Sequence, residues 1–358
     1  MTTSRRDLLR AAPLAAVGAL SACSGSPRRD PSVSPEPGDP PTTDETLTSG
    51  LQAPWAIAFH DGTALLSERD TARILELTDD GTTREVGVID AVTPGGEGGL
   101  LGLAVHEGTL FSYATTSGGN RIERRELGGE PGQLTLGPPE VLLDGIPSAA
   151  THNGGRLKIG PDGMLYATTG DAGDRSSAQD LDSLAGKILR IAPDGTVPGD
   201  NPFPGSPVYS TGHRNPQGLA WTDDGQLVAS EFGQNTWDEL NLIDPGGNYG
   251  WPEVEGIGEQ EGLVDPILQW SPSEASPSGI AIAGGTVYIA CLRGRRLRAV
   301  PLADPPAQTE LLVGEAGRLR DAVIAPDGSL WVLTNTTDGR GDPAPDGDRV
   351  LRLEVPAR

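Results

Sequence analysis

His152 is the side chain of this sequence whose type and setting best suit it to accept a proton. It lies in Thr151-His152-Asn153-Gly154-Gly155-Arg156, between two runs typical of strands. An imidazole is well matched to proton abstraction near neutral pH, and the glycines beside it let a ligand or another backbone come close. The pattern therefore indicates a general base, with an ordinary loop histidine as the alternative.

Two later segments carry residues suited to binding oxygen atoms and cations. In Gly212-His213-Arg214-Asn215-Pro216, Arg214 supplies a fixed cationic fork and Asn215 a donor and an acceptor, which suits carbonyl or carboxylate ligands. The segment 230–239 combines side-chain oxygens with Gly233, which exposes backbone carbonyls. Neither Cys nor a His pair lies nearby, so this segment suits Ca²⁺ better than zinc. A solvated acidic loop is the alternative.

Arginines gather in two places near the C-terminus. In Gly317-Arg318-Leu319-Arg320-Asp321, alternation along an extended segment puts both guanidinium groups on one face. The other cluster consists of Arg293, Arg295, Arg296 and Arg298. Like charges this close repel each other unless an anion or acidic side chains lie between them. The clusters therefore indicate either an anionic ligand or salt bridges to the many acidic residues of the chain.

The elements that must position these residues follow from a repeat that begins near residue 50. A short apolar run meets a glycine turn and a β-rich run follows, with turns at Gly62, Gly108, Gly163, Gly225, Gly285 and Gly328. Asp-Gly between apolar runs predicts a hairpin, and repeats of about 40–50 residues with several short strands are typical of propeller blades. We predict an all-β, six-bladed β-propeller over residues 49–358, with 177–185 as the one candidate helix.

Composition agrees with this fold and excludes several function classes. The 358 residues include 50 glycines and 32 prolines, and the net charge is −23. A chain this acidic repels phosphate backbones, so no nucleic-acid partner is expected. No run reaches about 18 apolar residues, so no transmembrane helix is expected. The two cysteines, Cys23 and Cys291, cannot form a disulfide framework.

The N-terminus resembles an export signal. Ser4-Arg5-Arg6-Asp7-Leu8-Leu9 resembles a twin-arginine motif, an Ala-rich run follows, and Leu20-Ser21-Ala22-Cys23 resembles a bacterial lipobox. We predict that residues 1–22 are a signal peptide, that Cys23 is lipidated, and that residues 23–48 form a proline-rich disordered tether. The domain would then be held at the extracytoplasmic face of the membrane. Ordinary secretion is the alternative.

Five segments, in order along the chain, resemble the quinoprotein glucose/sorbosone dehydrogenase family, which includes soluble glucose and aldose sugar dehydrogenases dependent on pyrroloquinoline quinone (PQQ). The segments are 96–103, 152–157, 185–190, 212–219 and 246–252, and the likeness runs from about Leu51 to Leu353. The resemblance implies a six-bladed propeller that holds PQQ over the mouth of its channel, with Ca²⁺ beside it.

The resemblance also implies roles for the reacting residues. His152 matches the general base that takes the sugar's hydroxyl proton while hydride leaves the anomeric carbon for the quinone. Arg214 and Asn215 match residues at the quinone carbonyls. Gly233 and Gln234 match positions whose backbone carbonyls bind Ca²⁺, although the family often has Pro at the second of these positions.

Further matches concern the cofactor, a second ion and the substrate. Arg293 matches a cationic family residue that contacts the cofactor, and Arg318 and Arg320 match arginines that bind its carboxylates. A second, structural Ca²⁺ site is matched more loosely by Asp238, Glu239 and Tyr249. Beside the substrate this chain has Glu97 and Thr151, where the soluble glucose enzymes have Gln and Asp, so glucose specificity and dimerisation do not carry over.

The resemblance thus implies oxidation of an aldose at its anomeric carbon to a lactone, with electrons passed to an external acceptor. Long insertions in the later blades, which belong to the dimeric glucose enzymes, are missing here, and we expect a monomer like the aldose sugar dehydrogenases. Two alternatives stay open. One is a non-catalytic cell-surface propeller that binds glycan or protein, and the other is a Ca²⁺-dependent propeller hydrolase.

Overall fold

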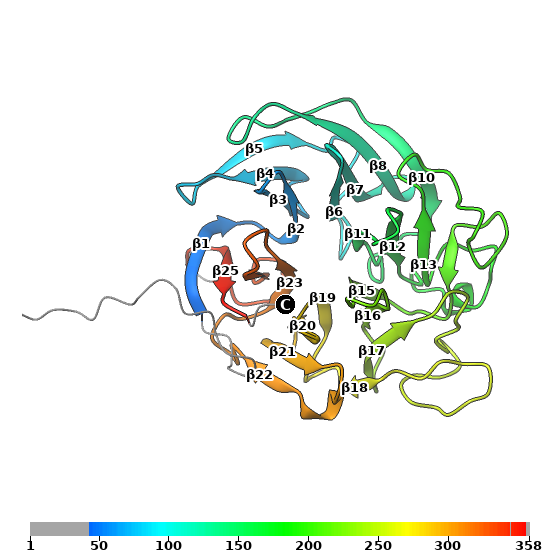
Figure 1. The fold of residues 1–358 in the computed structure, drawn as a ribbon. Coiled ribbons are helices and arrows are strands. Elements are labelled where there is room, and N and C mark those ends of the chain that lie inside the picture. Colours follow the sequence, from blue (N-terminus) through cyan, green and yellow to red (C-terminus); the bar gives the residue numbers. More distant parts are fainter. Residues whose placement is uncertain (1–42, 344, 356–358) are drawn as a thin grey trace, which may run out of the picture. The chain divides into compact units, whose positions relative to one another are not determined.

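The computed structural model describes residues 43–343 and 345–355, and these form six β-sheets arranged in a ring (Figure 1). Each sheet is one blade of a β-propeller, and its paired strands run antiparallel. The predicted all-β, six-bladed propeller is therefore confirmed. The predicted signal peptide and lipidation site, including Cys23, lie outside the described residues.

The strands follow one another blade by blade. The first blade holds β2 (Pro54–His60), β3 (Thr63–Glu68), β4 (Arg73–Leu77) and β5 (Thr83–Val88). The second holds β6 (Leu100–His106), β7 (Thr109–Thr116), β8 (Gly119–Gly128) and β10 (Glu140–Ile146), with β9 (Thr135–Leu136) beside β8. The third holds β11 (Leu157–Ile159), β12 (Leu165–Thr169), β13 (Lys187–Ile191) and β14 (Val208–Ser210).

The remaining three blades complete the ring. The fourth holds β15 (Pro216–Trp221), β16 (Leu227–Glu231), β17 (Asp238–Ile243) and β18 (Leu268–Trp270). The fifth holds β19 (Pro277–Ala283), β20 (Thr286–Cys291), β21 (Arg296–Pro301) and β22 (Thr309–Leu311). The sixth holds β23 (Leu319–Ile324), β24 (Leu330–Thr334), β25 (Asp348–Leu353) and β1 (Thr43–Leu51).

The sixth blade joins the two ends of the described chain. Its outermost strand, β1, pairs antiparallel with β25, with Thr46 opposite Leu351. Residues 43–48, which the sequence analysis assigned to a disordered tether, are therefore part of the propeller. The polar sequence of this segment misled the prediction, because an edge strand covered on one side needs few apolar residues.

The six glycines predicted at hairpin turns all lie between the first and second strands of a blade. Their φ angles are positive, between 71° and 89°, which glycine adopts without the strain that a Cβ atom brings. Between the blades, apolar side chains from both neighbours pack together. The largest such cluster joins Trp55, Leu100 and Leu157 of the first three blades. Sheets covered on both faces explain the continuous apolar runs of the inner strands.

Helical structure is minor in the described residues. The predicted helix at 177–185 is replaced by a 3₁₀ turn at Arg175–Ala178 followed by irregular backbone, and a second 3₁₀ turn spans Pro305–Ala307. Among residues 43–343 and 345–355, no helix is long and apolar enough to cross a membrane.

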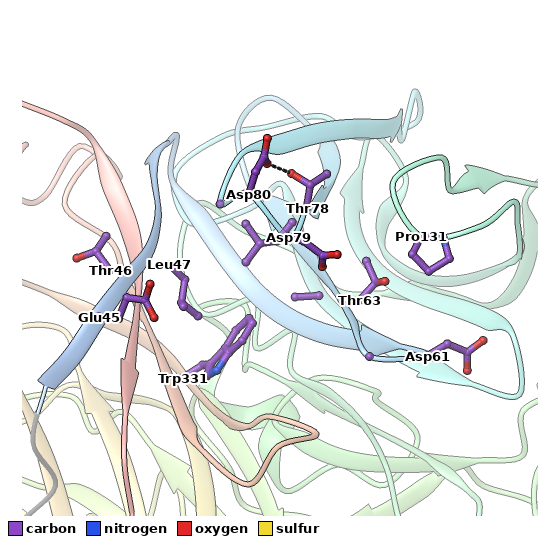
Figure 2. A pocket seen from close by; sticks show the side chains of 14 residues that line it. Glu45, Thr46, Leu47, Asp61, Thr63, Thr78, Asp79, Asp80, Pro131 and Trp331 are labelled. Atoms are coloured by element: carbon purple, nitrogen blue, oxygen red, sulfur yellow. Dashed lines mark hydrogen bonds between the residues drawn. The ribbon is translucent and has the colours of Figure 1, made fainter. Parts of the chain in front are cut away.

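The two ends of the channel differ in their loops. The innermost strands are β2, β6, β11, β15, β19 and β23. Loops that precede these strands lie at one end, which we call the site end, and the glycine hairpins lie at the other, the distal end. A cavity of about 700 Å³ lies at the distal end, beside the β2–β3 hairpin, and Figure 2 shows the side chains that line it. Its lining includes Glu45, Asp61, Asp79, Asp80 and Trp331 and contains none of the predicted site residues.

Candidate active site

A cavity of about 450 Å³ lies at the site end of the channel, where loops of several blades converge. It brings together ten of the residues predicted from the sequence: Glu97, Thr151, His152, Arg214, Asn215, Gly233, Gln234, Asp238, Arg293 and Arg318. Phe232, Leu292 and Arg340 also line it. Residues more than 200 positions apart in the chain thus meet, because each lies before an inner strand or where the second strand of a blade leads into the third.

His152 is held on three sides. Its backbone N–H donates to Glu97 Oε2 at 2.9 Å, Nδ1 lies 2.6 Å from Asp171 Oδ1, and Nε2 lies 2.9 Å from Arg214 Nη2. A guanidinium has only donors, so its contact with Nε2 requires a lone pair on that nitrogen. Nδ1 therefore carries the proton and donates it to Asp171. The histidine is held as the tautomer that can accept a proton at Nε2.

Asp171 orients His152 from below the cavity and is almost fully buried. It also accepts hydrogen bonds from the Gly173 N–H at 2.8 Å and from Trp251 Nε1 at 2.9 Å. Burial alone would raise the pKa of Asp171, but the hydrogen bonds from His152, Gly173 and Trp251 outweigh it and hold that pKa below its usual value. Asp171 is therefore a carboxylate that accepts the hydrogen bond from His152 Nδ1.

Arg214 spans the cavity between His152 and the β16–β17 loop. Its Nη1 donates to the backbone carbonyls of Gly233 at 2.6 Å and Phe232 at 3.1 Å, while its Nε is buried without a partner. Burial lowers the pKa of Arg214, and the carboxylates of Asp171 and Glu231 oppose that effect. The Arg214 guanidinium thus hydrogen-bonds both to His152 Nε2 and to the Gly233 carbonyl, which the sequence analysis assigned to Ca²⁺.

Asn215 lies where three loops come close together. Its Oδ1 accepts from the Gly154 N–H at 3.0 Å, and its Nδ2 is buried without a partner. Gly170 makes this approach possible, since a Cβ there would lie 2.0 Å from the His152 carbonyl oxygen. The Asn215 amide therefore presents an unsatisfied donor beside His152 and Arg214.

The C-terminal arginines divide into those at or beside the cavity and those paired with Glu310. Arg318 donates to Asp338 at 2.9 Å, and Arg320, just outside the cavity lining, donates to Gln217 at 2.8 Å and leaves its buried Nε unpaired. Burial lowers the pKa of Arg320 to about 9, although Asp338 opposes this effect. For Arg296 and Arg298, both ion-paired with Glu310, the salt-bridge alternative was correct. Within the described chain, Arg293 and Arg295 form no ion pair.

The predicted second metal site does not assemble through its side chains. Asp238 accepts from the Gly233 and Ser276 N–H groups, at 2.9 and 2.6 Å. Glu239, the next residue of β17, points to the opposite face of the strand and accepts from Asn241 and Gly256. Tyr249 stacks on His213 with ring centroids 4.8 Å apart. Among the residues that the structure describes, no three His, Cys, Asp or Glu side chains are grouped as a metal site.

The sequence profile of the glucose/sorbosone dehydrogenase family matches residues 51–343. The chain belongs to this family. A PQQ-bound aldose sugar dehydrogenase from Streptomyces coelicolor is 48% identical, with a TM-score of 0.85 over 90% of this chain and 99% of that one. The family resemblance inferred from the five segments is thereby confirmed, as is membership in a family of oxidoreductases.

Two curated relatives are also dehydrogenases. Quinoprotein glucose dehydrogenase B of Acinetobacter calcoaceticus is 34% identical over 284 residues, which cover 67% of this chain and 59% of that enzyme. This chain therefore spans less than two thirds of that relative's length. An aldose sugar dehydrogenase of Escherichia coli is 29% identical over 82% of this chain and 90% of its own length.

Sequence reasoning missed three residues of this family member's site. Asp171 lies two residues after the fully buried strand β12, and a carboxylate next to glycines at the end of such a strand was an available signal. Trp251 lies in a family motif, Gly246 to Pro252, but nothing in its spacing connects it with a residue 80 positions earlier. Arg340, which forms an ion pair with Glu97 at 2.7 Å, was also missed.

Proposed function

We propose that this protein oxidises an aldose at its anomeric carbon to the lactone, using PQQ and Ca²⁺, and passes the electrons to an external acceptor. The observation that carries the proposal is the His152–Asp171 pair, held as a proton acceptor beside hydrogen-bond donors that lack partners. The relative from Streptomyces coelicolor, similar over 90% of this chain, binds PQQ. The family match supports a sugar as the substrate class.

The residues present fit PQQ, a flat quinone with three carboxylates. Three buried atoms at or beside this cavity lack partners among the described residues, and all three are donors: Arg214 Nε, Asn215 Nδ2 and Arg320 Nε. A buried donor without an acceptor is costly, and quinone and carboxylate oxygens would remove that cost. Arg293 and Arg318 add positive charge to the same cavity, whose volume of about 450 Å³ lies in the range of small-molecule sites. Arg293, Arg318 and Arg320 would hold the carboxylates.

Calcium would be held at the β16–β17 loop. The Gly233 and Gln234 backbones line the cavity, and carbonyl oxygens are ligands that Ca²⁺ prefers. The Gly233 carbonyl already accepts a charged donor, Arg214 Nη1, at 2.6 Å, so it is oriented to receive positive charge. For the second Ca²⁺ site, the side chains of Asp238, Glu239 and Tyr249 give no such support, and we do not include that site in the proposal.

The chain's own residues supply the proton transfer. When bound, PQQ supplies a quinone carbon that accepts hydride from the anomeric carbon. His152 Nε2 takes the proton of the anomeric hydroxyl as the C–H bond breaks and the lactone C=O forms. Asp171 stabilises the imidazolium that results, and Arg214 stabilises negative oxygen in the cavity. The Arg214 Nη2 hydrogen bond must leave Nε2 before His152 can act.

Export and lipid anchoring through Cys23 are part of the proposal, with the substrate and the electron acceptor outside the cytoplasm. They are supported by the twin-arginine and lipobox motifs of residues 1–23. We also propose a monomer. Labelling cells with a lipid precursor and comparing wild type with Cys23→Ser tests the anchor, because only the wild type should take up the label and sediment with membranes.

The function is tested by adding PQQ and Ca²⁺ to purified protein and following dye reduction with a panel of aldoses. We expect reduction that requires both additions and that stops when Ca²⁺ is chelated. Failure of PQQ to bind at high concentration contradicts the proposal and favours a non-catalytic binding propeller. Binding of PQQ without reduction by any aldose contradicts the substrate class alone.

Replacement of Trp251 by Phe is expected to lower kcat about tenfold with little change in KM. The change removes the 2.9 Å hydrogen bond to Asp171 and keeps an aromatic ring beside Arg214. A hydrogen bond to a charged group contributes about 1.5–3 kcal/mol, of which part is lost from the orientation of His152. The Nδ1 proton of His152, observed by NMR without cofactor, should shift. An unchanged proton signal with unchanged kcat would show that Trp251 does not position Asp171.

A further inference from the structure

A second cavity lies at the distal end of the channel, at the opposite end from the candidate active site. Its volume is about 340 Å³, and its walls come from the innermost strands of four consecutive blades, β11, β15, β19 and β23. Pro161 and Thr222, which belong to glycine hairpins, line its rim. This position separates it from His152, which precedes β11 at the site end.

Lys158 is the basic residue in the lining of this cavity. In the part of the chain that the structure describes, its ammonium has no hydrogen-bond acceptor and no ion-pair partner. The carboxylate whose charge acts on Lys158 is Asp321, which is already paired with Arg156 at 2.9 Å. Asp321 also accepts from the N–H groups of Ile57 at 3.1 Å and Ala322 at 3.0 Å. The Asp321 carboxylate therefore has little charge left to offset the ammonium of Lys158.

Lys187, the other of the two lysines in the sequence, differs from Lys158 in its hydrogen bonds. Lys187 Nζ donates to three backbone carbonyls, those of Ser177, Ala178 and Ala185, at 2.6–3.1 Å. Lys158 has none of these contacts, although the chain as a whole carries a charge of −23. An unpaired lysine is unusual where acidic residues exceed basic ones almost twofold.

The walls around Lys158 carry several aliphatic side chains and one indole ring. They include Leu219, Ile280, Ile282 and Val323, and the Trp221 ring packs edge-on against Tyr166 with centroids 5.0 Å apart. The Trp221 indole N–H has no acceptor among the described residues. One carboxylate, Asp223, lies at the rim, where it is exposed. The cavity thus combines a lysine and an indole N–H donor with aliphatic side chains.

We propose that this distal cavity binds an organic anion with an apolar body, such as an aromatic carboxylate or sulfonate. The acidic group would pair with Lys158, and the body would lie against Trp221 and the aliphatic side chains. Burial lowers the pKa of Lys158, with Asp321 opposing the effect and Arg156 adding to it. A bound anion would reverse this effect, because an opposite charge nearby favours the ammonium.

The binding test uses two naphthylamine probes that differ in charge, the anion 1-anilinonaphthalene-8-sulfonate and the neutral N-phenyl-1-naphthylamine. We expect saturable fluorescence enhancement by the anion at one site, with weaker binding of the neutral probe. Lys158→Met should weaken the anion about tenfold or more, whereas Lys158→Arg should retain it. Arg124→Met, which removes a cation from the outer edge of the second blade, is the charge-matched control and should change nothing.

Arg293→Met distinguishes the distal cavity from the candidate active site, since Arg293 lines only the site end. The proposal is overturned if Lys158→Met binds the anion as wild type does, or if Arg293→Met shows the loss instead. A second measurement uses the wild type alone. The anionic probe should slow acetylation of Lys158 by acetic anhydride and leave Lys187 unaffected, as read from peptide masses. An unchanged Lys158 rate at saturating probe also overturns the proposal.

Discussion

Replacing His152 by alanine is expected to lower kcat for aldose oxidation about 100- to 10,000-fold, the range that a positioned general base contributes. PQQ affinity should stay within about threefold, because the donors at this cavity that lack partners among the described residues belong to Arg214, Asn215 and Arg320. Dye reduction under saturating PQQ and Ca²⁺ measures kcat, and the absorbance of the bound quinone measures affinity.

Asp171→Asn is the matched variant for the same site. It keeps the shape of the side chain, but it removes the negative charge that faces Nδ1 at 2.6 Å. We expect a loss of kcat smaller than that of His152→Ala, because a base is still present in a less favourable tautomer and orientation. Activity of His152→Ala near the wild-type level would contradict the assignment of the base, whatever the result for Asp171.

The second large effect concerns stability. Replacing Asp321 by asparagine is expected to lower the free energy of unfolding by about 3–5 kcal/mol, since it leaves a buried arginine unpaired. Arg156 and Asp321 are both almost completely buried, and a guanidinium nitrogen of Arg156 already lacks a partner. Trp55 covers the Arg156 guanidinium at 4.3 Å, so water cannot easily take the place of the carboxylate.

A surface ion pair provides the control for that measurement. Arg124 and Glu140 lie 2.8 Å apart, with side chains 31% and 59% exposed. Glu140→Gln should cost less than about 1 kcal/mol, as exposed pairs do. Urea unfolding of both variants gives the comparison. Equal losses in the two variants would mean that the central ion pair contributes no more than a surface contact.

The parts of the fold that the sequence predicted are those with local signals. A glycine that needs positive φ between two apolar runs marks a hairpin wherever it occurs, and all six such turns were found. The sequence did not predict strand β1, because β1 is recognised only through its pairing with β25, about 300 residues later. Strand pairing at that distance leaves no local trace in a polar segment.

The residues of the candidate site divide in the same way, into those with a local sequence signal and those without one. His152, Arg214 and Asn215 lie in glycine-rich motifs whose composition indicates chemistry, and the structure places them in contact. Asp171 and Trp251 act through hydrogen bonds between distant loops, which spacing does not encode. Of the arginines, the sequence left two explanations open, and the structure separates them. Arg296 and Arg298 are ion-paired with Glu310, while Arg293 lines the cavity and has no ion-pair partner within residues 43–343 and 345–355.

Anaerobic reduction of the bound quinone is the most direct test of the central claim. Protein loaded with PQQ and Ca²⁺ is mixed with an equivalent amount of aldose, and the absorbance of the oxidised quinone is followed without any dye. We predict rapid loss of that absorbance in the wild type and its persistence in His152→Ala over the same period. Persistence in the wild type with every aldose tried, or equally rapid loss in His152→Ala, would contradict the account.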